Sequence, residues 1–176
     1  MTHKISDDYF IVSENYKNVN YIVSYDDERD FDFLSNGTVA SFTPVVFKCF
    51  DFISTEKIKP IFDVYVSNDI ILSVDFYGKL KSTYLYKCSA VPASVNGSDY
   101  IYIHCGNVID IIDEDKLDFE MLSSMPVEKR IIFKPSEDSM TYLFHKSFIN
   151  NVLNGGALQS GKVISASKWT MEWMLS

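Results

Sequence analysis

The sequence has few cysteines and no long apolar segment. Its three cysteines, Cys49, Cys88 and Cys105, stand at scattered spacing among 176 residues, which indicates reduced thiols and not a disulfide framework. No apolar run approaches the roughly 20 residues that cross a bilayer, and the opening residues lack the apolar stretch of a signal peptide. We therefore expect a cytoplasmic protein that has no membrane partner.

Basic residues are also scarce. The chain has 16 lysines and arginines against 24 aspartates and glutamates, a formal net charge of −8. Binding to nucleic acid depends on basic surface that displaces counterions, so no nucleic-acid partner is expected. A basic protein partner fits the charge, although acidity of this degree also serves solubility alone.

Aromatic residues are abundant, with 13 Phe and 11 Tyr in a chain that is 47% hydrophobic. Aromatic and β-branched residues favour strands. The run "NVIDIIDEDKLDFE" predicts a strand followed by a turn at Asp113–Asp115, and "VVFKCFDFIS" predicts a strand that is buried on both faces. Other predicted strands are the two runs of "YFIVSENYKNVNYIVSY", as a hairpin or as separate strands, and "IFDVYV", "STYLYKCSAV", "SDYIYIHC", "RIIFKP", "TYLF" and "KVISAS".

Two segments of the chain resemble each other. Asp63–Gly78 matches Thr141–Gly156 when it is shifted by about 78 positions, and each copy predicts a strand, a capped helix and a glycine stop before the next strand. We expect the two copies to pack on one shared sheet and to cover each other's apolar helix faces; the alternative is chance similarity between two generic phrases. The first helix would be capped by Ser67, Asn68 or Asp69 and carry Ile70, Ile71, Val74 and Tyr77; the second would begin at Lys146 or Ser147 and carry Phe148, Ile149, Val152 and Leu153.

These elements predict a single α+β domain over residues 1–176. Many strands, two short helices and no regular βαβ alternation favour a mixed, mostly antiparallel sheet. Residues 60–176 hold the pseudo-repeat, and residues 1–59 form the N-terminal part.

The segments from Pro60 to Ser167 resemble a known protein family. In the immunity families of bacterial polymorphic toxin systems, the eleventh type especially and the forty-third type near it, an aromatic strand, a "VSE"-like cap and a short helix precede a tyrosine-rich strand and a "NVVDALD"-like segment. A final strand and helix close the domain. The matching pieces here are "DVYVSNDIILSVDFYG", "TYLYKCSAV", "YIYIHCGNVIDIIDEDKLDFE" and "TYLFHKSFINNVLNGG", with "VSN" and "FHK" at the positions of the two caps.

The resemblance implies a function in bacterial competition. Members of these immunity families bind and neutralise a cognate toxin and use no catalytic residues. The expected partner is therefore a toxin protein, and no cofactor is expected.

Catalysis by a cysteine and a histidine is the alternative. Adjacent residues on a strand point to opposite faces, so His104 cannot serve Cys105, but His145 could, and the protein would then be a small cytosolic hydrolase or transferase. No metal site is predicted, because the histidines are far apart in sequence and no C-x-x-C spacing occurs.

Two acidic clusters are the candidate toxin-binding residues. They would speed the encounter with a basic toxin, whereas most charge runs are simply solvated faces. A third hypothesis is a module that self-associates through a sheet edge. Trp169 and Trp173 are predicted either to close the core or to form an exposed end. The first cluster is Asp26, Asp27, Glu28, Asp30 and Asp32; the second is Asp113, Glu114, Asp115, Asp118 and Glu120, with Asp110 beside it.

Overall fold

A computed structural model describes residues 2–14, 21–27, 44–80, 85–114, 116–154 and 161–168 of the chain. Its strands are β1 (Tyr9–Glu14), β2 (Tyr21–Tyr25), β3 (Val45–Asp51), β4 (Val64–Val66), β5 (Ile70–Ser73), β6 (Cys88–Val95), β7 (Ser98–Cys105), β8 (Ile112–Asp113), β9 (Lys116–Leu117), β10 (Ile132–Phe133), β11 (Leu143–His145) and β12 (Gly161–Ser165). Its helices are α2 (Val74–Lys79) and α3 (Lys146–Asn154), with 3-10 turns η1 (Ile5–Asp8), η3 (Phe119–Leu122), η4 (Val127–Lys129) and η5 (Ala166–Lys168).

The strands form two main sheets. Six strands form one sheet in the order β2-β3-β6-β7-β5-β4, and four form the other in the order β10-β11-β1-β12. Within these sheets the pairing of β3 with β6 is parallel, and the remaining pairs are antiparallel. The expected α+β class with a mixed, mostly antiparallel arrangement is confirmed.

The six-stranded sheet curls until its two outer strands meet. The backbone N–H of Val23 on β2 donates to the hydroxyl of Tyr65 on β4 at 3.3 Å, and the ring centroids of Tyr21 and Tyr65 are 6.3 Å apart. The concave face is filled by aromatic and aliphatic side chains. This inner core consists of Tyr21, Val23, Val45, Phe47, Cys49, Phe62, Tyr65, Ile71, Val91, Ala93, Val95, Tyr100 and Tyr102.

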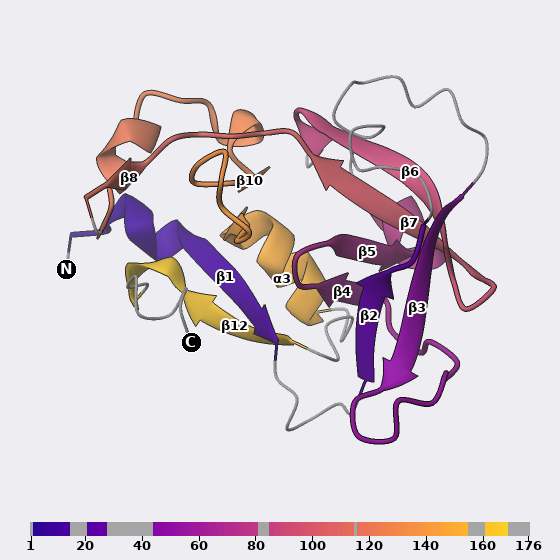
Figure 1. Cartoon of the computed structure of the whole chain (residues 1–176). Helices are drawn as coiled ribbons and strands as arrows, with labels where there is room; N and C mark the ends of the chain where they lie inside the picture. The colour runs from indigo at the N-terminus through magenta and orange to yellow at the C-terminus, as the bar shows by residue number, and fades with distance from the viewer. Residues whose placement is uncertain are drawn as a thin grey trace.

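A second core joins the convex face of the curled sheet to the four-stranded sheet. Figure 1 shows α3 between β1 and the β4–β5 pair. Phe148 and Ile149 of α3 pack there beside Phe144 of β11. From the curled sheet the same core receives Val64, Val66, Ile70, Leu72, Ile103 and Cys105.

A third core lies on the outer face of the four-stranded sheet. Alternate residues of β1 and β11 point to opposite faces, so Tyr9 and Leu143 belong to this core while Phe144 belongs to the second one. Phe119 and Leu122 of η3 cover it. The hydroxyl of Tyr9 accepts a hydrogen bond from the Arg130 guanidinium at 2.6 Å, which ties the 3-10 region to β1.

The β6–β7 hairpin is set by a two-residue turn. Asn96 and Gly97 both have positive φ, at 47° and 82°, as a type I′ turn requires. The Asn96 side chain donates to the carbonyls of Cys49 (2.5 Å) and Ile58 (2.7 Å) and accepts from the N–H of Cys49 (3.2 Å). The turn is therefore also anchored to β3 and to the loop that follows it.

The strand and the helix start of the second copy of the pseudo-repeat are as predicted, and the helix start of the first copy is not. A strand at Leu143–His145 leads into a helix at Lys146. In the first copy, however, Ile70–Ser73 is the strand β5, and the helix begins only at Val74 with Ser73 as its cap. The reason is that β5 is hydrogen-bonded on both sides, to β4 and β7, and this pairing outweighs a weak helical spacing.

Other details of the repeat also differ from the predictions. The two copies belong to different sheets, although both contribute to the second core. Gly78 lies inside α2 and provides no left-handed stop. Gly156 lies outside the described residues.

Several strand predictions need correction. Residues 107–111, predicted as a strand, are irregular apart from a bridge between Val108 and Lys134, because the chain there is held by hydrogen bonds from the Asn107 side chain to the carbonyls of Lys129 and Ile132. In "STYLYKCSAV" the strand begins only at Cys88.

Of the two alternatives for the first two runs, separate strands is confirmed, because β1 and β2 belong to different sheets. The strand β3 is buried on one face, where Val45, Phe47 and Cys49 alternate with the exposed Val46 and the half-buried Lys48.

Substitutions at Asn96 test the anchoring of the turn. Asn96→Gly keeps the positive φ but removes three side-chain hydrogen bonds, so we expect it to lower the free energy of unfolding by about 2 kcal/mol. Asn96→Asp should cost more, because its carboxylate would face two carbonyl oxygens. Urea denaturation measures both, and a wild-type value for Asn96→Gly would contradict the anchoring role.

Candidate functional site

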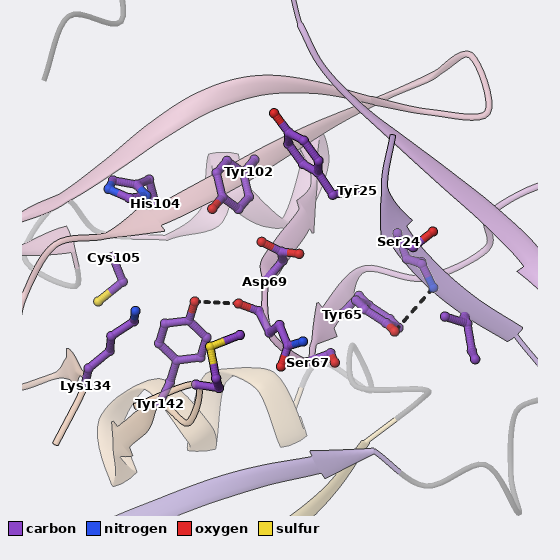
Figure 2. A pocket seen from close by; sticks show the side chains of 14 residues that line it. Ser24, Tyr25, Tyr65, Ser67, Asp69, Tyr102, His104, Cys105, Lys134 and Tyr142 are labelled. Atoms are coloured by element: carbon purple, nitrogen blue, oxygen red, sulfur yellow. Dashed lines mark hydrogen bonds between the residues drawn. The ribbon is translucent and has the colours of Figure 1, made fainter. Parts of the chain in front are cut away.

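A cleft of about 840 Å³ lies where the curled sheet meets the segment that joins β10 to β11. Figure 2 shows its side chains converging from β2, the β4–β5 turn, the end of β7 and the segment after β10. It is lined by Ile22, Val23, Ser24, Tyr25, Tyr65, Ser67, Asn68, Asp69, Tyr102, His104, Cys105, Lys134, Met140 and Tyr142.

Backbone hydrogen bonds hold the acidic side of the cleft in place. In the turn between β4 and β5, the N–H of Ser67 donates to the carbonyl of Asp69 at 3.0 Å. The Tyr142 hydroxyl donates to the carbonyl of Asn68 at 2.7 Å and so joins the turn to the second sheet (Figure 2). Asp69 is thereby fixed between Tyr102 and Tyr142.

Burial dominates the electrostatics of the cleft. It raises the pKa of the Asp69 carboxyl, although a hydrogen bond from Tyr102 and the charge of Lys134 act in the opposite direction. Burial, followed by the nearby Asp69, raises the pKa of the Tyr102 and Tyr142 phenols. Burial and the charge of Lys134 lower the pKa of His104. The cleft thus favours neutral side chains.

The amine of Lys134 and the thiol of Cys105 lie on one side of the cleft (Figure 2). The Lys134 Nζ is 5.9 Å from the centroid of the Tyr142 ring, within the range of a cation–π contact. The Cys105 Sγ is directed toward the carbonyls of Asn107 (3.8 Å) and Ile132 (4.0 Å). These groups can bind a polar ligand, but the thiol is not hydrogen-bonded to a base in this arrangement.

Cys105 and His145 face different cores. Cys105 belongs to the second core, between the two sheets. His145 points to the other face of β11, where its ring packs edge-on against Tyr9 at 5.5 Å and its Nδ1 lies 2.9 Å from the Ser147 hydroxyl. The pairing that the alternative hydrolase or transferase needs is therefore not formed.

The described members of the first acidic cluster are engaged with β3. Asp26 forms an ion pair with Lys48, and the Asp27 carboxylate accepts from the N–H of Val46 at 3.0 Å. Both carboxylates support the edge of the curled sheet. Glu28, Asp30 and Asp32 lie outside the described residues.

The second acidic cluster remains largely at the surface. Asp110, Asp113, Glu114 and Glu120 are exposed, whereas Asp118 caps η3 by accepting from the N–H of Glu120 at 3.1 Å. The predicted turn after β8 is confirmed at Glu114. Asp115, Trp169 and Trp173 lie outside the described residues.

The part of the chain that the structure describes contains neither a cluster of metal ligands nor a helix that could span a membrane. In that part, no three histidine, cysteine or acidic side chains gather as metal ligands would. None of the helices there has the length and apolar character needed to cross a bilayer.

No protein-family model matches the chain, and no curated protein matches it.

The sequence did not reveal the cleft. Asp69, Tyr102, Lys134 and Tyr142 come from four separate segments, and only the tertiary fold brings them together. A local signal existed for β7 alone, since alternation in "YIYIHC" places Tyr102 and His104 on one face.

The raised pKa of Asp69 predicts a pH-dependent cost in stability. Because the folded protein holds this proton more tightly than the unfolded chain, the stability that Asp69 contributes should fall as the pH rises from its ordinary pKa of 3.8 through the raised value. The free energy of unfolding of the wild type minus that of Asp69→Asn should therefore decrease over this range in urea titrations.

Asp99→Asn is the matched control, because Asp99 is an exposed carboxylate on β7. A wild-type advantage over Asp69→Asn that grows with pH across the same range would contradict the burial of Asp69.

Proposed function

We propose that this protein binds and neutralises a cognate bacterial toxin by surface complementarity, without a catalytic step of its own. The observation that carries the proposal is the acidic surface formed by Asp110, Asp113, Glu114 and Glu120. All four carboxylates are exposed, and between described residues none of them takes part in an ion pair. Such carboxylates are available to a basic partner.

The acidic surface has an apolar residue beside it. Met121 follows Glu120 directly and is 55% exposed. Methionine adapts its shape to a partner, and a protein interface combines such an apolar contact with a polar rim. Met121 therefore supports a protein as the ligand of this surface.

The 3-10 turn η3 beneath the acidic surface is anchored in the third core. Phe119 and Leu122 pack in this core, and the Asp118 carboxylate caps the same turn. A surface held in this way loses little conformational entropy when it binds. This preorganisation favours recognition by complementarity.

Glu114 occupies a position that its own backbone disfavours. Its φ of 52° is left-handed, and glycine would adopt this conformation more readily. Residues in such conformations often serve function at some cost in stability. The strain supports a role for the charge of Glu114 in binding.

The resemblance to immunity families supports a toxin as the partner. The segment "NVIDIIDEDK", which it shares with them, supplies Asp110, Asp113 and Glu114 of the acidic surface. Under the proposal, a basic toxin approaches this surface by electrostatic attraction.

Charge reversal on the acidic surface tests the proposal. The toxin is first identified as a protein that arrests bacterial growth and whose arrest is relieved by co-expression of this chain. The double variant Asp113→Lys and Glu120→Lys should then associate with it about tenfold more slowly or worse, because long-range attraction is lost. Surface plasmon resonance at two salt concentrations measures the rate.

Asp75→Lys with Asp99→Lys is the matched control, since it makes the same change of net charge at exposed positions elsewhere. Equal losses in both double variants would show that net charge alone matters. A chain that relieves no toxin's growth arrest would refute the proposed function itself.

The substitution Glu114→Gly should change the stability of the protein and its affinity for the toxin in opposite directions. We expect it to raise the free energy of unfolding by about 0.5–1 kcal/mol, because it relieves a left-handed backbone, while it weakens toxin binding. Thr55→Gly is the control, since Thr55 is also exposed and left-handed, with a φ of 58°. Unchanged binding by Glu114→Gly would remove Glu114 from the interface.

A further inference from the structure

The register of the β6–β7 hairpin places two cysteines opposite each other. Cys88, the first residue of β6, is the direct cross-strand partner of Cys105, the last residue of β7. The sequence separates them widely, and both are free thiols in this structure.

Cys88 and Cys105 occupy the type of pair in which side chains come closest. The N–H of Gly106 donates to the carbonyl of Lys87 at 3.0 Å, and hydrogen-bonded and non-hydrogen-bonded pairs alternate along an antiparallel ladder. Cys88 and Cys105 therefore form a non-hydrogen-bonded pair. The same alternation places Pro92, which has no N–H, opposite Ile101 at another such position.

This position is compatible with a disulfide. The Cα atoms of a non-hydrogen-bonded pair are about 4.5 Å apart, which lies within the range that disulfides span. Each of the two thiols shifts the pKa of the other, as their opposed positions across the ladder lead one to expect. Little backbone movement is needed to join them.

The third cysteine differs from this pair. Cys49 is fully buried in the inner core, and burial raises its pKa to about 11. Cys105 is also buried, but it borders the cleft. Cys88 is half-buried, and its side chain lowers the pKa of Cys105. Because the thiolate is the reactive form of cysteine, Cys105 is the first thiol that an oxidant in the cleft meets.

We propose that Cys88 and Cys105 are a redox modification site that a peroxide converts to an intramolecular disulfide. The Cys105 thiolate attacks one oxygen of hydrogen peroxide, the O–O bond breaks, and a sulfenic acid and one water result once a proton is taken up. The Cys88 sulfur then attacks the sulfenic sulfur, the S–O bond breaks, and the second water leaves as the S–S bond forms. The two thiols lose two electrons and two protons in total, and the peroxide is reduced to two waters.

The disulfide would be reversible and would lie in the wall of the cleft. A bond between directly opposed strands is constrained by the ladder, and constrained disulfides are the more easily reduced ones. It would tie the open end of the hairpin beside Lys134 and Tyr142, so the state of the thiols and the shape of the cleft are linked.

Peptide mapping of the full, reduced chain after hydrogen peroxide treatment tests the site. We expect one cross-linked peptide that joins Cys88 to Cys105 and is lighter than the two free peptides by two hydrogen atoms, while Cys49 is still alkylated by iodoacetamide. Dithiothreitol should restore all three thiols. Cys88→Ser and Cys105→Ser should each abolish the cross-link, and Cys49→Ser should retain it.

The mapping on the wild-type chain decides the outcome even if a serine variant fails to fold. Alkylation of both Cys88 and Cys105 after peroxide treatment, overoxidation of Cys105 without a cross-link, or a link that involves Cys49 or a second chain would each overturn the proposal.

Discussion

The register of the β6–β7 hairpin is the constraint on which the other features of this protein depend. The strand β7 is buried on both faces: Tyr100 and Tyr102 point into the inner core, and Ile103 and Cys105 point into the core between the sheets. A shift of one residue would exchange these two sets. The left-handed pair Asn96–Gly97 prevents that shift, since a two-residue turn fixes which residues face each other. The Asn96 side chain also donates a hydrogen bond to the carbonyl of Cys49, which fixes the position of the hairpin relative to β3.

The cleft follows from the way the two sheets meet. The six-stranded sheet curls so that β2 and β4 meet at Val23 and Tyr65. The cleft is bordered by Tyr142, which directly precedes β11 of the second sheet and hydrogen-bonds to Asn68. The polar side chains that line the cleft lose contact with water, which disfavours their charged forms, and burial therefore raises the pKa of Asp69. The acidic surface stands instead on η3 and the β8–β9 turn, over the third core. The proposed recognition of a toxin and the proposed redox site thus occupy different parts of the molecule.

Local sequence patterns predicted the strands and helices well where the pattern fits only one type of secondary structure. Ser98–Cys105 is rich in aromatic and β-branched residues and is a strand over the predicted range, and the helix at Lys146 begins where it was expected. The helix prediction failed at Ile70–Ser73, because the apolar spacing there fits a helix and a buried strand alike. Pairing on both sides with β4 and β7 decided between them. The cleft could not be predicted, because Asp69 and Lys134 meet only through the packing of two sheets. The pair Cys88–Cys105 had a usable signal: Asn96–Gly97, between two strand-like runs, specifies a register that sets these cysteines opposite each other.

Cross-strand contacts between Hα protons, measured by nuclear Overhauser spectroscopy in deuterated water, test the hairpin register most directly, because these protons approach closely only at non-hydrogen-bonded pairs. The structure predicts cross-peaks for Cys88 with Cys105 and for Ala90 with Ile103. Cross-peaks displaced by one residue, such as Ser89 with Cys105, would contradict the register and with it the arrangement of the cores, the cleft and the cysteine pair.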